Sequence, residues 1–293
     1  MYKTEALKKI EKLDPLKDAW EIVRLSIQYE FPWDYNRALE LGLYKTYAIP
    51  SISKILHRTK ELEKHTQKRY DDTDILLSEI LENGLKDKDG RGWKAMQQIN
   101  WIHSNYNISN DDYLYVLCTF IFPTYHWINK YGYRKLTYHE ELAGFYIWKE
   151  IGEAMHIKNI PDNIKELEKF YVNYEKENMK FSDDNIPLAS ATENMFLGWY
   201  LPMRMHKIFR PLLYSVMDNH LLNAFNYNKP DILLRNIVTQ SLRIRSKVAN
   251  LISVKPFVRT KDFKHKAYPN GYQLEDLGPE KLLKSPQCPF RKT

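Results

Sequence analysis

The amino-acid sequence predicts an all-α protein, and two features of the chain support that prediction. Glycine is scarce, with 10 residues in a chain of 293. Apolar residues recur mostly three and four positions apart, which is the period of an amphipathic helix. A chain of this length can bury a core without disulfide bonds or metal ions. We therefore expect one large helical domain over residues 1–254, followed by an irregular tail over residues 255–293.

Proline and glycine residues divide the first half of the chain into helices. Pro32 and Pro50 mark boundaries, because proline lacks an amide proton and fits only the first turn of a helix. Gly84 stands just past a periodic segment, where the end of a helix favours glycine. The expected helices are 18–29, 33–47, 51–62, 68–83 and 92–106.

Capping residues mark the helices of the second half. Ser109 or Asn110 is expected to cap a helix with acidic residues in its first turn, and Thr137–Glu140 has the form of a capping box. Pro123 is expected to kink or break the helix that contains it. The polar stretch 176–187 is the best candidate for a linker. The expected helices are 111–131, 137–155, one that starts at Pro161, 190–200, 203–224 with an interruption at Pro211, and 230–254.

The positive charge of the protein is concentrated in the tail. The net charge of the chain is +7. Residues 255–293 contain nine Lys and Arg and four Asp and Glu, so this segment carries +5 of that charge. The sequence therefore predicts no broad nucleic-acid-binding face. A basic end can contact anionic lipid headgroups, and the alternative is a solvated surface. Tyr268, Tyr272 and Phe290 are expected to pack the tail onto the body.

The cysteines and the apolar runs bear on localisation. Cys118 and Cys288 form no CxxC pair and no disulfide framework, which fits a reducing compartment. No run of apolar residues reaches the length of about 18 that a transmembrane helix needs. The residues after Met1 are polar, unlike a signal peptide. We expect a cytoplasmic protein, with a peripheral membrane contact as the alternative.

His103 is a candidate metal ligand. It shares one helical stripe with Met96, Ile99 and Tyr106, at spacings of three and four residues. One interpretation is a buried histidine that is hydrogen-bonded to a backbone carbonyl. The other is an axial haem ligand, with Met96 and Ile99 lining the porphyrin plane, because a neutral imidazole nitrogen binds iron.

Arg69 and Thr73 form a second candidate site on the preceding helix. They are four residues apart and so are neighbours on one helix face, and Asp72 lies beside them. One interpretation is a surface Arg–Asp pair. The other is a set of polar contacts to a bound ligand.

Other catalytic patterns are missing from the sequence. A di-iron helical bundle needs two Glu-x-x-His pairs, and the chain has one, Glu153–His156. The sequence has no His-Glu-x-x-His zinc motif, no glycine-rich phosphate loop and no Gly-x-Ser-x-Gly elbow.

Eight short motifs together resemble the MpaB oxygenase family, which shares a catalytic domain with the bacterial rubber oxygenases called latex clearing proteins. The resemblance covers roughly residues 25–280, most of the chain, and it depends on the order and spacing of the motifs. The motifs are Phe31-Pro-Trp33, the stretch from Ala48 to Leu56, Arg69-Tyr-Asp-Asp-Thr73, Ile99-Asn-Trp-Ile-His103, the stretch from Tyr131 to Thr137, Ile151-Gly-Glu-Ala-Met155, Tyr268-Pro-Asn-Gly-Tyr272 and Leu277-Gly-Pro279.

This resemblance implies a globin-like helical core, a b-type haem and the oxygen-dependent cleavage or oxidation of a carbon–carbon double bond in an isoprenoid or similar hydrophobic substrate. It implies that His103 is the proximal iron ligand. Arg69 and Thr73 match a distal arginine and threonine that shape the oxygen pocket. We thus expect Arg69, Thr73 and Asp72 at the reaction site, and His103, Met96, Ile99 and Arg69 around the haem. The alternative is a non-catalytic helical protein that binds a lipid or terpenoid.

The chain departs from the rubber oxygenases at two places. Those enzymes have a lysine where this chain has Asp72. They also use a glutamate base one helix earlier, whereas this chain has no acidic residue between Leu41 and Lys60. The resemblance therefore implies the fold and the haem more directly than it implies the distal mechanism.

Overall fold

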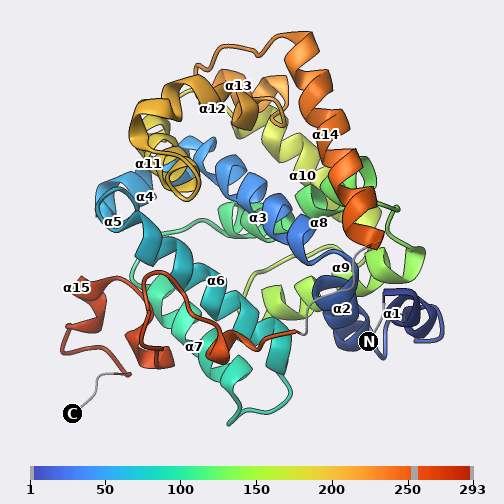
Figure 1. Ribbon diagram of the computed structural model, residues 1–293. Helices are drawn as coiled ribbons and strands as arrows, with labels where there is room; N and C mark the ends of the chain where they lie inside the picture. Colours follow the sequence, from blue (N-terminus) through green and yellow to red (C-terminus); the bar gives the residue numbers. More distant parts are fainter. Residues whose placement is uncertain (1–2, 252–256, 291–293) are drawn as a thin grey trace.

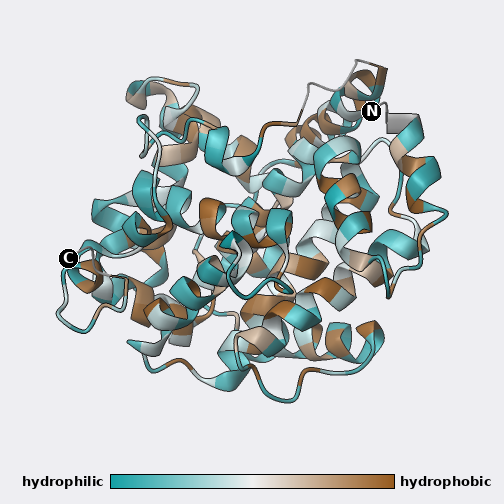
Figure 2. Ribbon diagram, turned by 90° about the horizontal axis from the view of Figure 1, so that it is seen from below, coloured by the Kyte–Doolittle hydropathy of each residue, from teal (hydrophilic) through white to brown (hydrophobic). Residues whose placement is uncertain are grey.

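A computed structural model describes residues 3–251 and 257–290, and every regular element in these ranges is a helix (Figure 1). The all-α prediction is confirmed. Apolar and hydrophilic residues alternate along the same helices (Figure 2), as expected where one face of each helix is buried. No helix in the described ranges is long and apolar enough to cross a membrane.

The helices follow one another with short connections. One of them, η1, is a π-helix, and η2 to η4 are single 3₁₀ turns. In chain order the elements are α1 (Lys3–Ile10), α2 (Ala19–Leu25), η1 (Ser26–Glu30), α3 (Pro32–Tyr47), α4 (Pro50–Thr59), α5 (Glu61–Lys64), α6 (Thr66–Asn83), α7 (Arg91–Ser104), α8 (Asn110–Tyr131), α9 (Tyr138–Ala154), α10 (Ile164–Asn178), α11 (Asn185–Gly198), η2 (Met203–Met205), α12 (His206–Tyr214), α13 (Asn219–Ala224), α14 (Ile232–Leu251), η3 (Thr260–Asp262), η4 (Leu274–Asp276) and α15 (Glu280–Leu283).

The capping residues identified in the sequence lie at the ends of helices in the structure. The Ser109 hydroxyl accepts a hydrogen bond from the amide of Asp112 at the start of α8, and Thr137 and Glu140 form the capping box of α9. Gly84 ends α6 with a φ of +70°, a conformation that favours glycine. The predicted break at Pro211 was wrong, because α12 runs through that residue to Tyr214.

The predicted break at Pro123 was also wrong, because α8 continues through it to Tyr131, and the alternative that Pro123 kinks the helix stays a prediction. A proline in a helix leaves the carbonyl four residues earlier without its amide partner, and here that carbonyl belongs to Thr119. Gly42 of α3 packs against this carbonyl, so closely that a Cβ atom on Gly42 would lie 2.6 Å from the oxygen. The two helices that meet here, α3 and α8, form the centre of the molecule (Figure 1).

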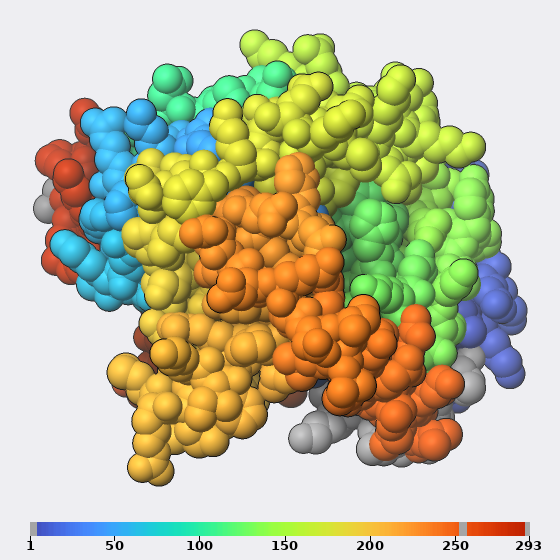
Figure 3. Space-filling model, turned by 90° about the horizontal axis from the view of Figure 1, so that it is seen from above, coloured from blue at the N-terminus to red at the C-terminus, as the bar shows by residue number. Residues whose placement is uncertain are grey.

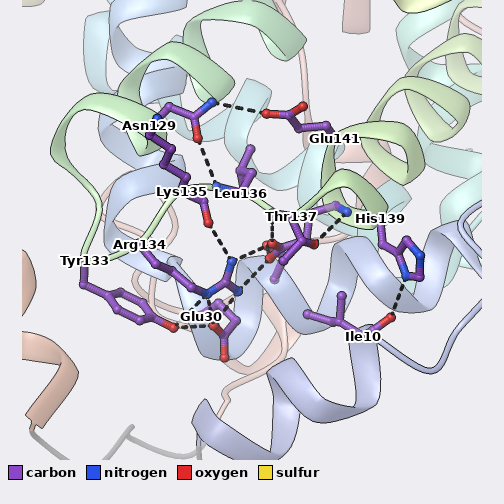
Figure 4. Close-up of polar contacts among 12 residues, drawn as sticks. Ile10, Glu30, Asn129, Tyr133, Arg134, Lys135, Leu136, Thr137, His139 and Glu141 are labelled. Atoms are coloured by element: carbon purple, nitrogen blue, oxygen red, sulfur yellow. Dashed lines mark hydrogen bonds and ion pairs between the residues drawn. The ribbon is translucent and has the colours of Figure 1, made fainter.

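A buried ion network joins the N-terminal helices to α9 (Figure 4). The guanidinium of Arg134 lies 2.6 Å from a carboxylate oxygen of Glu30, in η1, and 2.6 Å from one of Glu140, in α9. Both carboxylate side chains are fully buried. Ser26 donates to the other oxygen of Glu140 at 2.7 Å. The motif from Tyr131 to Thr137 therefore supplies a structural contact.

The C-terminal segment 257–290 lies against α6 and α7 (Figure 1). The amide of Ala267 donates to Asp71 at 2.7 Å, and the Tyr272 hydroxyl donates to Glu79 at 2.6 Å. The side-chain amide of Gln98 in α7 donates to the Leu277 carbonyl at 2.8 Å. The predicted boundary between residues 254 and 255 lies outside the described residues, as do residues 291–293.

Candidate functional site

A largely apolar cavity of about 270 Å³ lies between α3, α6, α7 and α8. Its walls also include residues of α4, α9 and α11, and the C-terminal segment adds Gly278 and Pro279. Five of the six predicted site residues line it, and they come from two helices. These five are Arg69, Asp72 and Thr73 of α6 and Ile99 and His103 of α7, whereas Met96 does not belong to the lining.

The imidazole of His103 lacks the hydrogen bond that an ordinary core histidine makes. Its Nδ1 atom is buried and has no hydrogen-bond partner. The centre of its ring lies 5.7 Å from that of Tyr113. Burial, with a smaller contribution from the positive charge of Arg69, lowers the pKa of His103 to about 4. The ring is therefore neutral at physiological pH, which is the form that binds a metal.

Arg69 and Thr73 bind one another across one turn of α6. The Arg69 guanidinium donates to the Thr73 hydroxyl, and that hydroxyl donates to the Arg69 carbonyl at 3.0 Å. The expected surface pair between Arg69 and Asp72 does not form, because the carboxylate of Asp72 pairs with Lys68 at 2.7 Å. Arg69 therefore keeps other N–H groups available to the cavity.

Met96 is part of the hydrophobic core, and Asp72 forms hydrogen bonds to the C-terminal segment. Met96 is fully buried in the core, so a contact between it and a cofactor stays a prediction. The carboxylate of Asp72 holds the C-terminal segment, because it accepts hydrogen bonds from the Tyr268 hydroxyl and, at 3.1 Å, from the Gly278 amide. A catalytic role for Asp72 also stays a prediction.

Two of the residues of α3 that line the cavity, Glu40 and Tyr47, have side chains of functional interest that were not predicted. Glu40 is buried, forms an ion pair with Arg37 at 2.5 Å and accepts from the Tyr70 hydroxyl at 3.1 Å. Burial raises the pKa of Glu40 to about 7, with Arg37 opposing the rise. Glu40 lies one residue before the interval from Leu41 to Lys60, which contains no acidic residue. Glu40 lies three residues before Leu43 and so shares an apolar stripe with it. An acidic residue in an apolar stripe is the sequence signal that would have indicated Glu40.

The second residue is Tyr47, whose side chain is fully buried and whose hydroxyl has no hydrogen-bond partner. Burial raises the pKa of Tyr47, and the nearby Thr192 hydroxyl and, to a smaller extent, the positive charge of Arg69 offset part of that rise. Thr192 of α11 also lines the cavity near this hydroxyl. Arg69 is thus the centre of a small polar cluster with Thr73, His103 and Tyr47.

The donor set of the cavity fits a haem better than a bare metal ion. Within residues 3–251 and 257–290, no group of three or more His, Cys, Asp or Glu side chains could hold a metal ion. The porphyrin supplies four ligands to haem iron, so the protein needs to add only one or two axial ligands. The neutral imidazole of His103, in a mostly apolar cavity, has the chemistry of such a ligand.

Comparison with known proteins gives three curated relatives of this chain. An ER-bound oxygenase mpaB of Penicillium roqueforti is 27% identical over 229 residues, which is 72% of this chain and 76% of the relative. An ER-bound oxygenase mpaB′ of Penicillium brevicompactum is 28% identical over 73% of this chain and 54% of the relative. An ER-bound oxygenase mpaB of the same species is 30% identical over 49% of this chain, a match that spans 38% of the relative. No family model matches the chain. These relatives support an oxygenase-like function that uses O2 and a small-molecule substrate.

Proposed function

Because the chain belongs to the MpaB-like oxygenase family, we propose that it is a haem b-dependent oxygenase. In this proposal it cleaves or oxidises a carbon–carbon double bond of an isoprenoid or similar hydrophobic molecule, with O2 as the oxidant. The observation that supports this most directly is the unpartnered, neutral imidazole of His103 at the wall of an apolar cavity.

His103 is the residue that would hold the haem iron. A bound haem would supply the binding and activation of O2. The neutral state of His103 matters here, because a protonated imidazole has no free lone pair for a metal. Ile99, one turn earlier on α7, adds an apolar contact on the same wall.

Arg69 is the strongest hydrogen-bond donor of the polar cluster. The single proton of the Thr73 hydroxyl is already donated to the Arg69 carbonyl, at 3.0 Å, so Thr73 acts by holding the guanidinium in place. The remaining N–H groups of Arg69 can donate to an oxygen atom of a bound molecule or to a cofactor carboxylate. The Tyr47 hydroxyl provides one more group beside it.

Glu40 is a group of the cavity that can take up and release a proton near neutral pH, and Asp74, whose pKa burial raises to about 6, is another. With its pKa at about 7, a large fraction of Glu40 is protonated at physiological pH. The Tyr70 hydroxyl and Arg37 hold its carboxylate. Glu40 thus lies at the cavity wall with a proton available.

The substrate site would be the apolar part of the cavity. Leucine and isoleucine side chains of α3, α4 and α6 form much of its wall, which suits a hydrocarbon chain. The relatives are named ER-bound, and a hydrophobic substrate partitions into lipid. We therefore include a peripheral membrane contact in the proposal.

A second candidate function is the binding of a lipid or terpenoid without turnover. The apolar wall favours it as much as it favours an oxygenase. The carboxylate of Asp72 also favours the binding protein, because it already contacts Lys68 and the C-terminal segment and is not free to take part in a reaction.

The test is the absorption spectrum of the full chain after reconstitution with haemin, recorded oxidised, reduced, and reduced under carbon monoxide. A haem b-dependent oxygenase would show a Soret band that shifts with both treatments. His103→Ala should lose iron ligation, whereas His126→Ala, which changes an exposed histidine of α8, should keep the spectrum.

An unchanged spectrum in His103→Ala would exclude this residue as the ligand. A folded protein that shows no Soret band with excess haemin would exclude the haem enzyme and favour the binding protein. In that case a prenyl alcohol should still raise the unfolding temperature.

A further inference from the structure

Helix α14 lies on the outside of the molecule and has an apolar stripe that faces away from the body. Along the whole of this described helix, Ser246 alone is buried. Five of its exposed apolar residues follow spacings of four, seven, four and three, so these five share one helix face. They are Leu233, Ile237, Ile244, Val248 and Leu251. We call these five residues the α14 stripe.

The opposite face of α14 holds the helix to the body. The guanidinium of Arg245 lies 3.6 Å from the ring centre of Trp33 and 3.3 Å from the carboxylate of Asp34. Leu242 packs against the hydrophobic core. The orientation of α14 is therefore fixed by its inner face, and the stripe is directed outward as a consequence.

The charges of α14 are all of one sign. Residues 232–251 contain four Lys and Arg and no Asp or Glu. Two of these cations, Arg243 and Lys247, are exposed beside the stripe. The nearest acidic residue in sequence, Asp231, accepts a hydrogen bond from the amide of Leu233 at the helix start.

A second apolar patch continues this face at η2 and α12. Met203 and Ile208 are 81% and 73% exposed, and the cations Arg204 and Lys207 are exposed next to them. Helices α12 and α14 contact one another. Figure 3 shows the gold segment that holds η2 and α12 and the orange α14 protruding on the same side of the molecule.

We propose that the α14 stripe and the exposed residues of η2 and α12 form a surface that docks onto an anionic phospholipid bilayer. Large exposed apolar side chains with flanking Lys and Arg are the pattern of a helix that lies in a membrane interface. Cations beside such a helix add attraction to acidic headgroups. This inference gives the membrane contact of the proposed function a location. It places that contact outside the basic tail, and it does not depend on haem.

The experiment measures sedimentation of the full chain with vesicles of phosphatidylcholine, with and without phosphatidylserine. The parent protein should bind the vesicles that contain phosphatidylserine, and more weakly at high salt. Val248→Glu should weaken binding by about tenfold, because it puts a charge in the centre of the apolar face. The matched control is Val172→Glu on α10: Val172 is 52% exposed and Val248 is 50% exposed, and the control should change binding by less than about twofold.

Several results would overturn the proposal. One is no binding of the parent protein to either vesicle, and another is an equal loss of binding in the two glutamate variants. A third result is a concentration-dependent dimer that Val248→Glu dissociates while vesicle binding stays the same. The occupant of the stripe would then be a second copy of this chain.

A labelled variant keeps the test valid if Val248→Glu does not fold. A fluorophore on Ile244→Cys should shift to the blue when vesicles with phosphatidylserine are added, and the same label on Val172→Cys should not. The natural Cys118 and Cys288 are both buried. No shift at position 244 would contradict the proposal. The haem spectrum of Val248→Glu should equal that of the parent, so a failure of the haem proposal is distinguished from a failure of this one.

Discussion

The backbone amide of Gly278 donates a hydrogen bond to the carboxylate of Asp72 at 3.1 Å, across 206 positions of the sequence. The same carboxylate accepts from the Tyr268 hydroxyl and from Lys68. Because Gly278 and Pro279 line the cavity, this one side chain of α6 holds part of the cavity wall in place.

Asp72→Asn should therefore loosen the C-terminal segment. The change removes a charged acceptor for three donors, and we expect a loss of about 1–3 kcal/mol in the free energy of unfolding. Limited proteolysis should cut within residues 257–290 sooner than in the parent. Asp183→Asn, at an exposed position between α10 and α11, is the control and should change neither measurement. If the segment of Asp72→Asn is as resistant to proteolysis as that of the parent, Asp72 does not hold it.

Glu40 should make stability depend on pH in a direction opposite to that of an ordinary carboxylate. Its pKa is about 7 in the folded protein, against an ordinary value of 4.5, so the folded state binds more protons than the unfolded state between these pH values. Its contribution to stability is present below pH 4.5 and is lost as the pH rises through about 7. Glu40→Gln should be more stable than the parent at pH 8, by up to about 3 kcal/mol.

Urea unfolding of the parent and of Glu40→Gln at several pH values measures this difference. The gap between the two proteins should close as the pH falls toward 4.5. Glu275→Gln, in the C-terminal segment, should show no such trend. A gap that stays constant with pH would mean that the pKa of Glu40 is not raised.

Arg134→Met should be among the most destabilising substitutions in the chain. It would leave the buried carboxylates of Glu30 and Glu140 without their cation. Removing one member of a buried ion network typically costs about 3–5 kcal/mol. Chemical denaturation should show this loss, and the triple variant that adds Glu30→Gln and Glu140→Gln should recover part of it. Arg58→Met on the exposed side of α4 is the control; an equally small effect at both arginines would contradict a structural role for the network.

Gly42→Ala should destabilise the protein even though alanine is the better helix former. In an exposed helix the change would gain about 1 kcal/mol. Here the new Cβ would lie 2.6 Å from the carbonyl oxygen of Thr119, and forced overpacking costs about 1–3 kcal/mol. At Gly198 of α11 the nearest atom to a new Cβ is 3.9 Å away. Thermal unfolding should therefore rank Gly198→Ala above the parent and Gly42→Ala below it; the same rank for both would mean that α3 can move away from α8.

The parts of the structure that could be predicted from the sequence depend on residues close together in the chain. Ser109, Thr137 and Gly84 act within one helix turn, so their effects are readable from the sequence. The continuation of α8 through Pro123 was not readable, because the freed carbonyl of Thr119 packs against Gly42 on another helix. Of the candidate site, Arg69, Thr73 and His103 were found through motifs, and the structure brings them to one cavity.

The other residues of the site belong to the part of α3 that lies between two of the motifs. Glu40 and Tyr47 lie on α3, and their neighbours in the cavity come from α6 and α11, distant in the sequence. Their functional interest depends on burial and on missing or shared hydrogen-bond partners, which only the packed structure provides. The contacts of Asp72 with Tyr268 and Gly278 were unpredictable for the same reason, because these residues follow 196 and 206 positions later.

The π-helical turn of η1 makes the N-terminal part of the chain sensitive to its length. Loss of one residue within Ser26–Glu30 would convert the turn to an ordinary α-helical one and rotate everything before it by about 100°. The core residues of α2 would then face away from α9, although no residue type had changed. Related chains should therefore tolerate substitutions in this stretch far better than insertions or deletions, and an alignment without gaps across residues 19–35 is the pattern to expect among them.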